Sequence, residues 1–300
     1  MTAGAAGAAP GQAPVTVVGL GLMGAALAGA FVTRGHPTTV WNRSPGKDGP
    51  LVERGATSAA TPAEAFTAAP LAVLCVKDHE AVREILRQAG EALSGRVLVD
   101  LTTGTSEDAL RTAREAEGFG ARYLDGAILA TPDAIGLPDT AILYSGPTAL
   151  FTEHEATLAA LGGSPLHLGA TEGLASLYDV ALLGAMWSSL NGVLHATALV
   201  GSEGVGADAF APFAGMLFQA MGVFVTRYAE QIAAGDFTAD DSTVRTHLAG
   251  VAHLVRESAV RGVDGTLPGH LRSVLTEVAA RGHAEDSYAS VVEYFRKPAL

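Results

Sequence analysis

Residues 15 to 47 carry the pattern that most restricts how this chain can fold, because a short strand, a glycine-rich turn, a helix and a second strand follow one another there. The stretch reads VTVVGLGLMGAALAGAFVTRGHPTTVWNRSPGK. Its first four residues are all β-branched and mostly apolar, which predicts a strand buried on both faces. The spacing Gly-x-Gly-x-x-Gly then follows at Gly19, Gly21 and Gly24. This combination is typical of the first turn of a dinucleotide-binding βαβ unit.

Each of the three glycines has its own expected task. Gly19 allows the tight turn, Gly21 lets the backbone approach a pyrophosphate, and Gly24 lets the following helix pack closely on the strand. The free N–H groups and the dipole at the start of that helix favour phosphate groups. We therefore expect a Rossmann domain whose first turn contacts a dinucleotide through Gly19, Leu20, Gly21, Leu22, Met23 and Gly24.

The residues after the second expected strand, 38–41, select the cofactor. NAD-binding chains usually carry Asp or Glu there to hold the ribose hydroxyls, and a carboxylate would repel a 2′-phosphate. This chain instead has Asn42, Arg43 and Ser44, and Lys47 follows. A guanidinium offers a fork of donors that matches phosphate. The sequence therefore predicts NADPH over NAD; the alternative is a glycine-rich turn with a solvated basic loop.

The composition narrows the class of protein. A chain of 300 residues with 48% hydrophobic content suits one large or two moderate domains. Its formal net charge of −12 argues against nucleic acid and anionic membranes as partners, and favours small-molecule chemistry. The single cysteine, Cys75, predicts a buried thiol, a cytoplasmic location and no cysteine-based metal site. Residues 1–14 are rich in Ala and Gly and are expected to form a flexible tail.

Strand-like runs recur after the first βαβ unit, with helical patterns between several of them. This alternation predicts a doubly wound sheet over residues 15–171, which binds ligands at the carboxyl ends of its strands. We expect cofactor contacts at two such ends, from Cys75, Val76 and Lys77 and from Thr102 and Thr103. The expected strands are 71–76, 96–101, 122–124 and 141–144, with a further one around Leu166.

The strand signal stops at Thr171, which indicates a change of domain. Thr171 can cap a helix over residues 172–200, about 43 Å long. This interdomain helix is apolar on nearly every face and must be covered all round. The segment 210–226 also needs burial, and residues 201–300 alone look insufficient. We therefore predict an all-α dimerisation domain over 201–300 and an obligate homodimer with interlocked helical domains.

One part of the expected interdomain helix is long enough to cross a bilayer. Residues 180–202 carry no formal charge. The stretch nevertheless contains Ser188, Asn191 and His195 and lacks flanking Lys or Arg. A buried helix of a protein without a membrane partner is the better interpretation.

A Rossmann domain followed by a long central helix and a helical domain resembles the β-hydroxyacid dehydrogenase superfamily, with its 6-phosphogluconate dehydrogenase-like architecture. In that superfamily a lysine on the central helix protonates a carbonyl oxygen during hydride transfer. The matching stretch here reads GLASLYDVALLGAMWSSLNG and holds Asp179 at the lysine position. The chain's only lysines are Lys47, Lys77 and Lys297, so none lies on this helix. A carboxylate there suits a substrate that is, or becomes, a cation.

That replacement, together with four further segments, resembles the NADPH-dependent imine reductases. The segments are VGLGLMGAALA, VWNRSPGK, DLTTGTSED and YLDGAILATPDAIGLPDTAILYSGP. The resemblance implies reduction of a C=N bond and makes Asp179 the catalytic residue. Asp179 either donates the proton, if its surroundings raise its pKa, or stabilises an iminium that arrives protonated. The structural alternative is an ion pair between Asp179 and an arginine.

Helical spacing also predicts part of the substrate pocket. Leu183 and Met186 fall on the face of Asp179, with Trp187 at its edge. Core packing is the alternative for the leucine, whereas the resemblance implies an aromatic side chain against the substrate at Trp187. A reductive-aminase-like subset of the family carries Asn at the position of Thr103, which leaves amine coupling open.

Two other functions stay open beside imine reduction. One is a 3-hydroxyacid dehydrogenase with an altered catalytic residue, and the other is a non-catalytic NADPH-binding protein.

Overall fold

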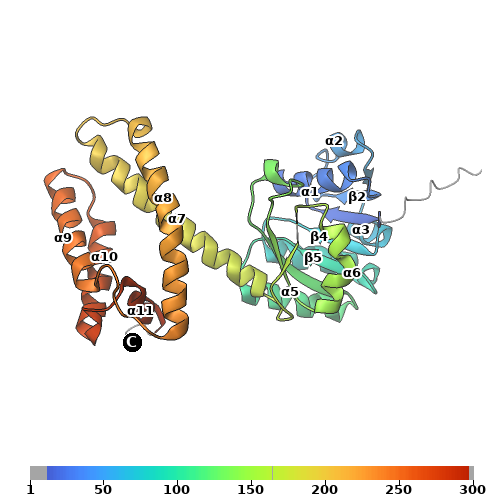
Figure 1. Cartoon of the computed structure of the whole chain (residues 1–300). Coiled ribbons are helices and arrows are strands. Elements are labelled where there is room, and N and C mark those ends of the chain that lie inside the picture. The colour runs from blue at the N-terminus through green and yellow to red at the C-terminus, as the bar shows by residue number, and fades with distance from the viewer. Residues whose placement is uncertain (1–11, 164, 297–300) are drawn as a thin grey trace, which may run out of the picture. The chain divides into compact units, whose positions relative to one another are not determined.

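The structure is a computed structural model that describes residues 12–163 and 165–296. The chain divides into two compact units, residues 1–184 and 185–300. The first holds the sheet and the second is helical (Figure 1). Most of the tail expected over residues 1–14, namely 1–11, lies outside the described residues.

In the described part of the first unit, eight strands form one sheet, in the order β3-β2-β1-β4-β5-β6-β7-β8. Neighbouring strands are parallel except β6 and β7, which pair antiparallel. The strand order reverses at β1 and β4, and ligands bind at such a switch point in doubly wound sheets. The expected sheet is confirmed. Its strands are β1 (Val15–Val18), β2 (Thr38–Trp41), β3 (Thr57–Ser58), β4 (Leu71–Leu74), β5 (Val97–Asp100), β6 (Arg122–Ile128), β7 (Ile142–Ser145) and β8 (Leu166–His167).

Helices cover both faces of the sheet, because alternate strand residues point to opposite sides. Val17 and Tyr144 pack on one side with Phe31 of α1, in a core that α2 and α6 complete. Leu74 and Leu98 pack on the other side with residues of α3, α4 and α5. Both sides are therefore buried, as the continuous apolar strands require. The helices are α1 (Leu22–Thr33), α2 (Gly49–Val52), α3 (Pro62–Ala68), α4 (His79–Ala89), α5 (Ser106–Gly118) and α6 (Thr148–Leu158).

The long helix expected after the sheet is α7, and it begins at Leu174, two residues later than predicted. Gly173 precedes it with a φ of 78°. Thr171 does not cap α7, because the N–H groups of Ala175 and Ser176 bond to side chains of the sheet instead. The helix ends at Gly201, close to the expected end at residue 200.

Among its described residues, the helical unit contains the C-terminal part of α7 and four further α-helices. Its small core is formed by α9, α10 and the turn before α11, around Val244, Leu275 and Val278. Along α7 and α8, by contrast, large apolar side chains are exposed in the single chain, among them Phe213 and Leu217. The further helices are α8 (Ala207–Ala234), α9 (Val244–Val260), α10 (Thr266–Val278) and α11 (Val292–Arg296).

Of the described helices, α8 has the length and apolar composition of a membrane span, with a mean hydropathy of 1.5. Only 6% of its most apolar window is buried. Length and composition alone are weak evidence, since core helices of soluble proteins share them.

Candidate functional site

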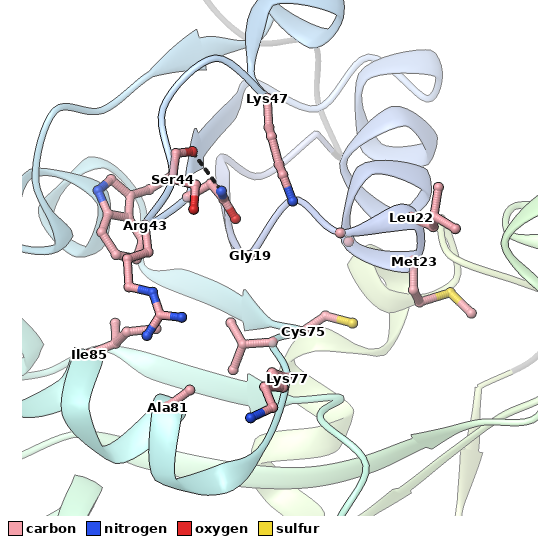
Figure 2. Close-up of a pocket in the computed structure, with 15 residues that line it drawn as sticks. Gly19, Leu22, Met23, Arg43, Ser44, Lys47, Cys75, Lys77, Ala81 and Ile85 are labelled. Carbon is pink, nitrogen blue, oxygen red and sulfur yellow. Dashed lines mark hydrogen bonds between the residues drawn. The ribbon is translucent and has the colours of Figure 1, made fainter.

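A cavity of about 370 Å³ opens at the switch point of the sheet, between the carboxyl ends of β1, β2 and β4 (Figure 2). Twelve of the fifteen residues predicted to bind the cofactor line it. They come from three separate loops, which only the parallel sheet brings together. These residues are Gly19, Gly21, Leu22, Met23, Gly24, Asn42, Arg43, Ser44, Lys47, Cys75, Val76 and Lys77.

The three glycines of the first turn meet different surroundings. A Cβ at Gly19 or Gly24 would collide with backbone oxygens, of Cys75 and Gly19 respectively. A Cβ at Gly21 would meet no atom of the described chain within 4 Å, although Gly21 lines the cavity. The protein itself therefore requires Gly19 and Gly24, whereas the open space at Gly21 is free for a ligand.

The start of α1 is suited to an anion. Among the described residues, no side chain caps this helix and no acidic residue lies in its first turn. Its free N–H groups therefore face the cavity without a competing partner. Leu20, also predicted to contact the cofactor, does not line the cavity: its backbone N–H donates to Asn42 Oδ1 at 2.9 Å and its side chain is buried in the core.

Two cations reach the cavity from the loop after β2. Arg43 extends toward α4 and Lys47 extends toward the turn at Gly19 (Figure 2). Arg43 Nη1 lies 3.8 Å from Glu84 Oε2, and both side chains are more than half exposed. Such an exposed pair contributes little to stability and leaves the guanidinium available. The Asn42 amide donates to the Ser44 carbonyl at 2.8 Å and so shapes this loop.

The ends of β4 and β5 are joined by hydrogen bonds. Val76 N donates to Thr102 Oγ1 at 3.2 Å, and Thr102 N donates to Asp100 Oδ1 at 3.0 Å. Thr102 is buried and lies behind the cavity, not on its surface. Burial, and next the Asp100 charge, raises the pKa of Cys75 to about 12, so this thiol stays protonated and unreactive.

Asp179 lies in the second turn of α7 with only 6% of its surface exposed. Burial raises the pKa of its carboxyl group, and the negative charge of Asp125 raises it further. A hydrogen bond from the Thr103 side chain acts in the opposite direction. No arginine or lysine of the described chain contributes to this pKa or pairs with Asp179, so the ion-pair alternative finds no support. The side chain is thus a buried acid that reaches a residue at the end of β5.

The predicted pocket residues along α7 are less covered. Leu183 is half-buried, while Met186 and Trp187 are exposed in the single chain. Met186 and Trp187 belong to the second unit. Their role against a substrate stays a prediction.

Comparison with known proteins agrees with this site. Residues 14–169 match the model of the NAD binding domain of 6-phosphogluconate dehydrogenase, and residues 171–297 match that of an NADPH-dependent reductive aminase-like C-terminal domain. The chain is 35% identical over 289 residues to the NADPH-dependent reductive aminase of Aspergillus oryzae, covering 94% of this chain and 97% of that protein.

The chain belongs to the family of NADPH-dependent reductive aminases and imine reductases. Two solved members agree with this conclusion. A reductive aminase from Aspergillus terreus in complex with NADPH4, cyclohexanone and allyl amine is 40% identical, with a TM-score of 0.88, covering 95% of this chain and all of that one. An imine reductase of Streptomyces aurantiacus is 36% identical, with a TM-score of 0.90 and the same coverage. The resemblance drawn from sequence segments is therefore confirmed.

Three further residues line the same cavity and were not predicted from the sequence, namely Trp41, Ala81 and Ile85. Trp41 is the last residue of β2. Because ligands bind at the carboxyl ends of the strands, its position in the sequence could have indicated a place beside the cofactor. Ala81 and Ile85 lie one turn apart on α4, and nothing in their chemistry distinguishes them from core residues.

Proposed function

We propose that this chain reduces the C=N bond of imines, cyclic imines among them, to amines with NADPH. The observation that carries the proposal is Asp179: a buried carboxyl group with a raised pKa stands where hydroxyacid enzymes carry a lysine. Its Thr103 partner lies at the carboxyl end of β5, beside the cofactor edge of the sheet. The Aspergillus terreus relative, which carries NADPH4 with a ketone and an amine, supports the same chemistry.

The cavity in the Rossmann unit fits NADPH. The uncapped start of α1 and the open space at Gly21 suit a pyrophosphate, and the cations of Arg43 and Lys47 suit a 2′-phosphate. Ser44 adds a hydroxyl donor in the same loop. When bound, NADPH supplies the hydride that adds to the imine carbon and is thereby oxidised to NADP⁺.

In the proposed reaction, Asp179 supplies the proton that the nitrogen needs after hydride transfer. Addition of hydride to the carbon leaves an electron pair on nitrogen, which must take up one proton to give the amine. A carboxylic acid donates that proton if it is still protonated near neutral pH, and burial without a cationic partner favours the protonated form. We therefore propose that Asp179 donates this proton and that its carboxylate is reprotonated from solvent after each turnover.

The experiment is a spectrophotometric assay that follows NADPH absorbance with a small cyclic imine, and separately NADP⁺ with a 3-hydroxyacid. Imine-dependent loss of NADPH supports the proposal. Turnover of the hydroxyacid alone would favour the dehydrogenase, and cofactor binding without turnover would favour a non-catalytic protein. Asp179→Ala is expected to lower kcat for the imine by about 100-fold or more, with NADPH affinity nearly unchanged. Undiminished turnover by this variant would remove Asp179 from the mechanism.

Reductive amination is a second candidate, favoured by the match to a reductive aminase-like domain and by the Aspergillus oryzae relative. It differs from imine reduction in one step, since the enzyme must also promote condensation of a ketone with an amine. Assay of cyclohexanone with equimolar and with excess allyl amine separates the two. Turnover that requires a large excess of amine indicates reduction of imine formed in solution.

The proposed enzyme works as a homodimer in the cytoplasm. The support is the apolar surface of α7 and α8, where Phe213, Met216 and Leu217 are all more than half exposed in one chain. A cavity of about 430 Å³ between these helices has almost wholly apolar walls. Monomeric soluble proteins rarely expose such continuous apolar patches, and a second copy would cover it. Cytoplasmic placement rests on the single cysteine, Cys75, whose thiol is partly buried and free of any disulfide.

A further inference from the structure

A second buried carboxylate meets the first turn of the helix that carries Asp179. Asp125 lies on β6 and is fully buried. Its Oδ2 accepts from Ser176 N at 2.9 Å and from Ser145 Oγ at 3.2 Å, and its Oδ1 accepts from Ser176 Oγ at 2.6 Å. Ser145 Oγ in turn accepts from Ala175 N at 2.9 Å. Two N–H groups at the start of α7 are thus bound by side chains of the sheet.

The paired strands β6 and β7 hold this contact in place. Asp125 and Ser145 are opposite each other in the antiparallel register. The first N–H groups of a helix lack intrahelical partners, and a negative charge is favoured near them. A buried carboxylate is costly without such donors, and Asp125 has three. The arrangement therefore fixes both the position and the rotation of the first turn of α7 on the sheet.

Asp179 is three residues after Ser176, on the same face of the helix. Both side chains are buried, and each interacts with Asp125, Ser176 through a hydrogen bond and Asp179 through the charge. We propose that Asp125 is the positioning residue of Asp179: it orients the first turn of α7 and places a second negative charge near the acid that protonates the substrate nitrogen. The inference rests on the proposed imine reduction, in which Asp179 acts as a proton donor.

The electrostatics agree with this geometry. After burial, the charge of Asp125 is the largest cause that raises the pKa of Asp179. The same charge also acts on Asp100 of β5, on Tyr123 of β6 and on Glu172 before α7, raising the pKa of each. On Asp100, the neighbouring His79 acts in the opposite direction and lowers the pKa of the Asp100 carboxyl group. Within the described residues, no cation contributes to the pKa of Asp179, so the Asp125 charge is not offset there.

The sign of the pH dependence follows. An acid that must donate a proton loses activity as the pH rises through its pKa. Removing the charge of Asp125 lowers the pKa of Asp179, so the alkaline fall of kcat moves to lower pH. The hydroxyl of Thr103 has the opposite effect, because its hydrogen bond favours the ionised carboxyl group.

The experiment compares the pH profile of kcat, at saturating cyclic imine and NADPH, for the wild type and Asp125→Asn. The same imine is used throughout, so its own titration is common to every profile. We expect the alkaline limb to move down by about one pH unit, with KM for NADPH nearly unchanged. Thr103→Val, of similar shape, is expected to move the limb upward. Glu153→Gln removes a half-exposed carboxylate of α6 that does not act on Asp179 and is expected to leave the limb in place.

A folded Asp125→Asn variant with an unmoved or raised limb would overturn the proposal and leave Asp125 a purely structural helix anchor. If that variant does not fold, Ser176→Ala tests the positioning part, since it removes the 2.6 Å hydrogen bond and keeps both carboxylates. A several-fold loss of kcat without loss of NADPH affinity supports the proposal, and an unchanged kcat contradicts it. Asp179→Asn distinguishes failure of this inference from failure of the proposed function. If that variant retains wild-type imine reduction, the proposed role of Asp179 as proton donor is wrong, and not merely the role of Asp125.

Discussion

At the scale of single residues, we propose that Arg43 lets the cavity distinguish two cofactors that differ by one phosphate. Its guanidinium makes a loose contact with Glu84, and its side chain is 69% exposed. A charge-assisted contact with phosphate is about twice as strong as a neutral hydrogen bond. The same side chain gains no such contact with a ribose hydroxyl.

We therefore expect Arg43→Ala to raise KM for NADPH by about tenfold, with little change in KM for NADH. Steady-state kinetics with both cofactors measures the effect. Arg87→Ala is the matched control, because Arg87 is an arginine of α4 with half its side chain exposed and lies outside the cavity lining. An equal loss for NADPH and NADH would show that Arg43 does not read the 2′-phosphate.

At the scale of elements, the turn from β1 into α1 combines two different requirements for glycine. Gly24 is needed because the helix passes directly against the backbone of Gly19. Gly21 is needed for no contact within the described chain, and its φ of −68° is open to any residue. Packing and ligand binding are thus assigned to neighbouring positions of one turn.

The two glycines should respond differently to the same added methyl group. Gly21→Ala is expected to leave the thermal midpoint within a few degrees of the wild type and to weaken NADPH binding by about tenfold or more, because the Cβ fills the space expected for the pyrophosphate. Gly24→Ala is expected to lower the thermal midpoint clearly. Thermal unfolding without cofactor and fluorescence titration with NADPH measure the two effects. Equal loss of stability in both variants would contradict this division.

At the scale of the whole molecule, the apolar side chains of α7 and α8 are exposed in the single chain and need a partner that buries them. Burial of apolar surface contributes about 25 cal/mol per Å², so leaving these helices bare would forfeit much of the stabilisation that their composition offers. A second copy presents the same surface and can close the contact symmetrically.

Sedimentation is expected to give twice the chain mass of 30.5 kDa at all practical concentrations. Leu217→Glu places a charge on the exposed face of α8 and is expected to shift the protein toward monomer and to lower imine reduction. Val52→Glu is the control, since Val52 is an exposed apolar residue of α2 in the first unit. A wild-type monomer that retains full activity would contradict the dimer.

The sequence alone determined the Rossmann unit and predicted the cofactor contacts and the candidate acid. These depend on short-range patterns: glycine spacing after a β-branched strand, a basic loop in place of an acidic one, and Asp179 at a defined place on an otherwise uncharged helix. The start of α7 was misplaced by two residues, because Thr171 offered a local cap whereas the true partners of the first turn lie on distant strands.

Only the tertiary structure decided what surrounds Asp179. Asp125 is 51 residues from Ser176 in sequence, and no periodicity relates them. The antiparallel pairing of β6 with β7 brings Asp125 and Ser145 together beneath the helix, and burial there makes one carboxylate act on another. Residue type and local spacing therefore specify which group can donate a proton, while long-range packing sets the dielectric and the neighbouring charges that control its pKa.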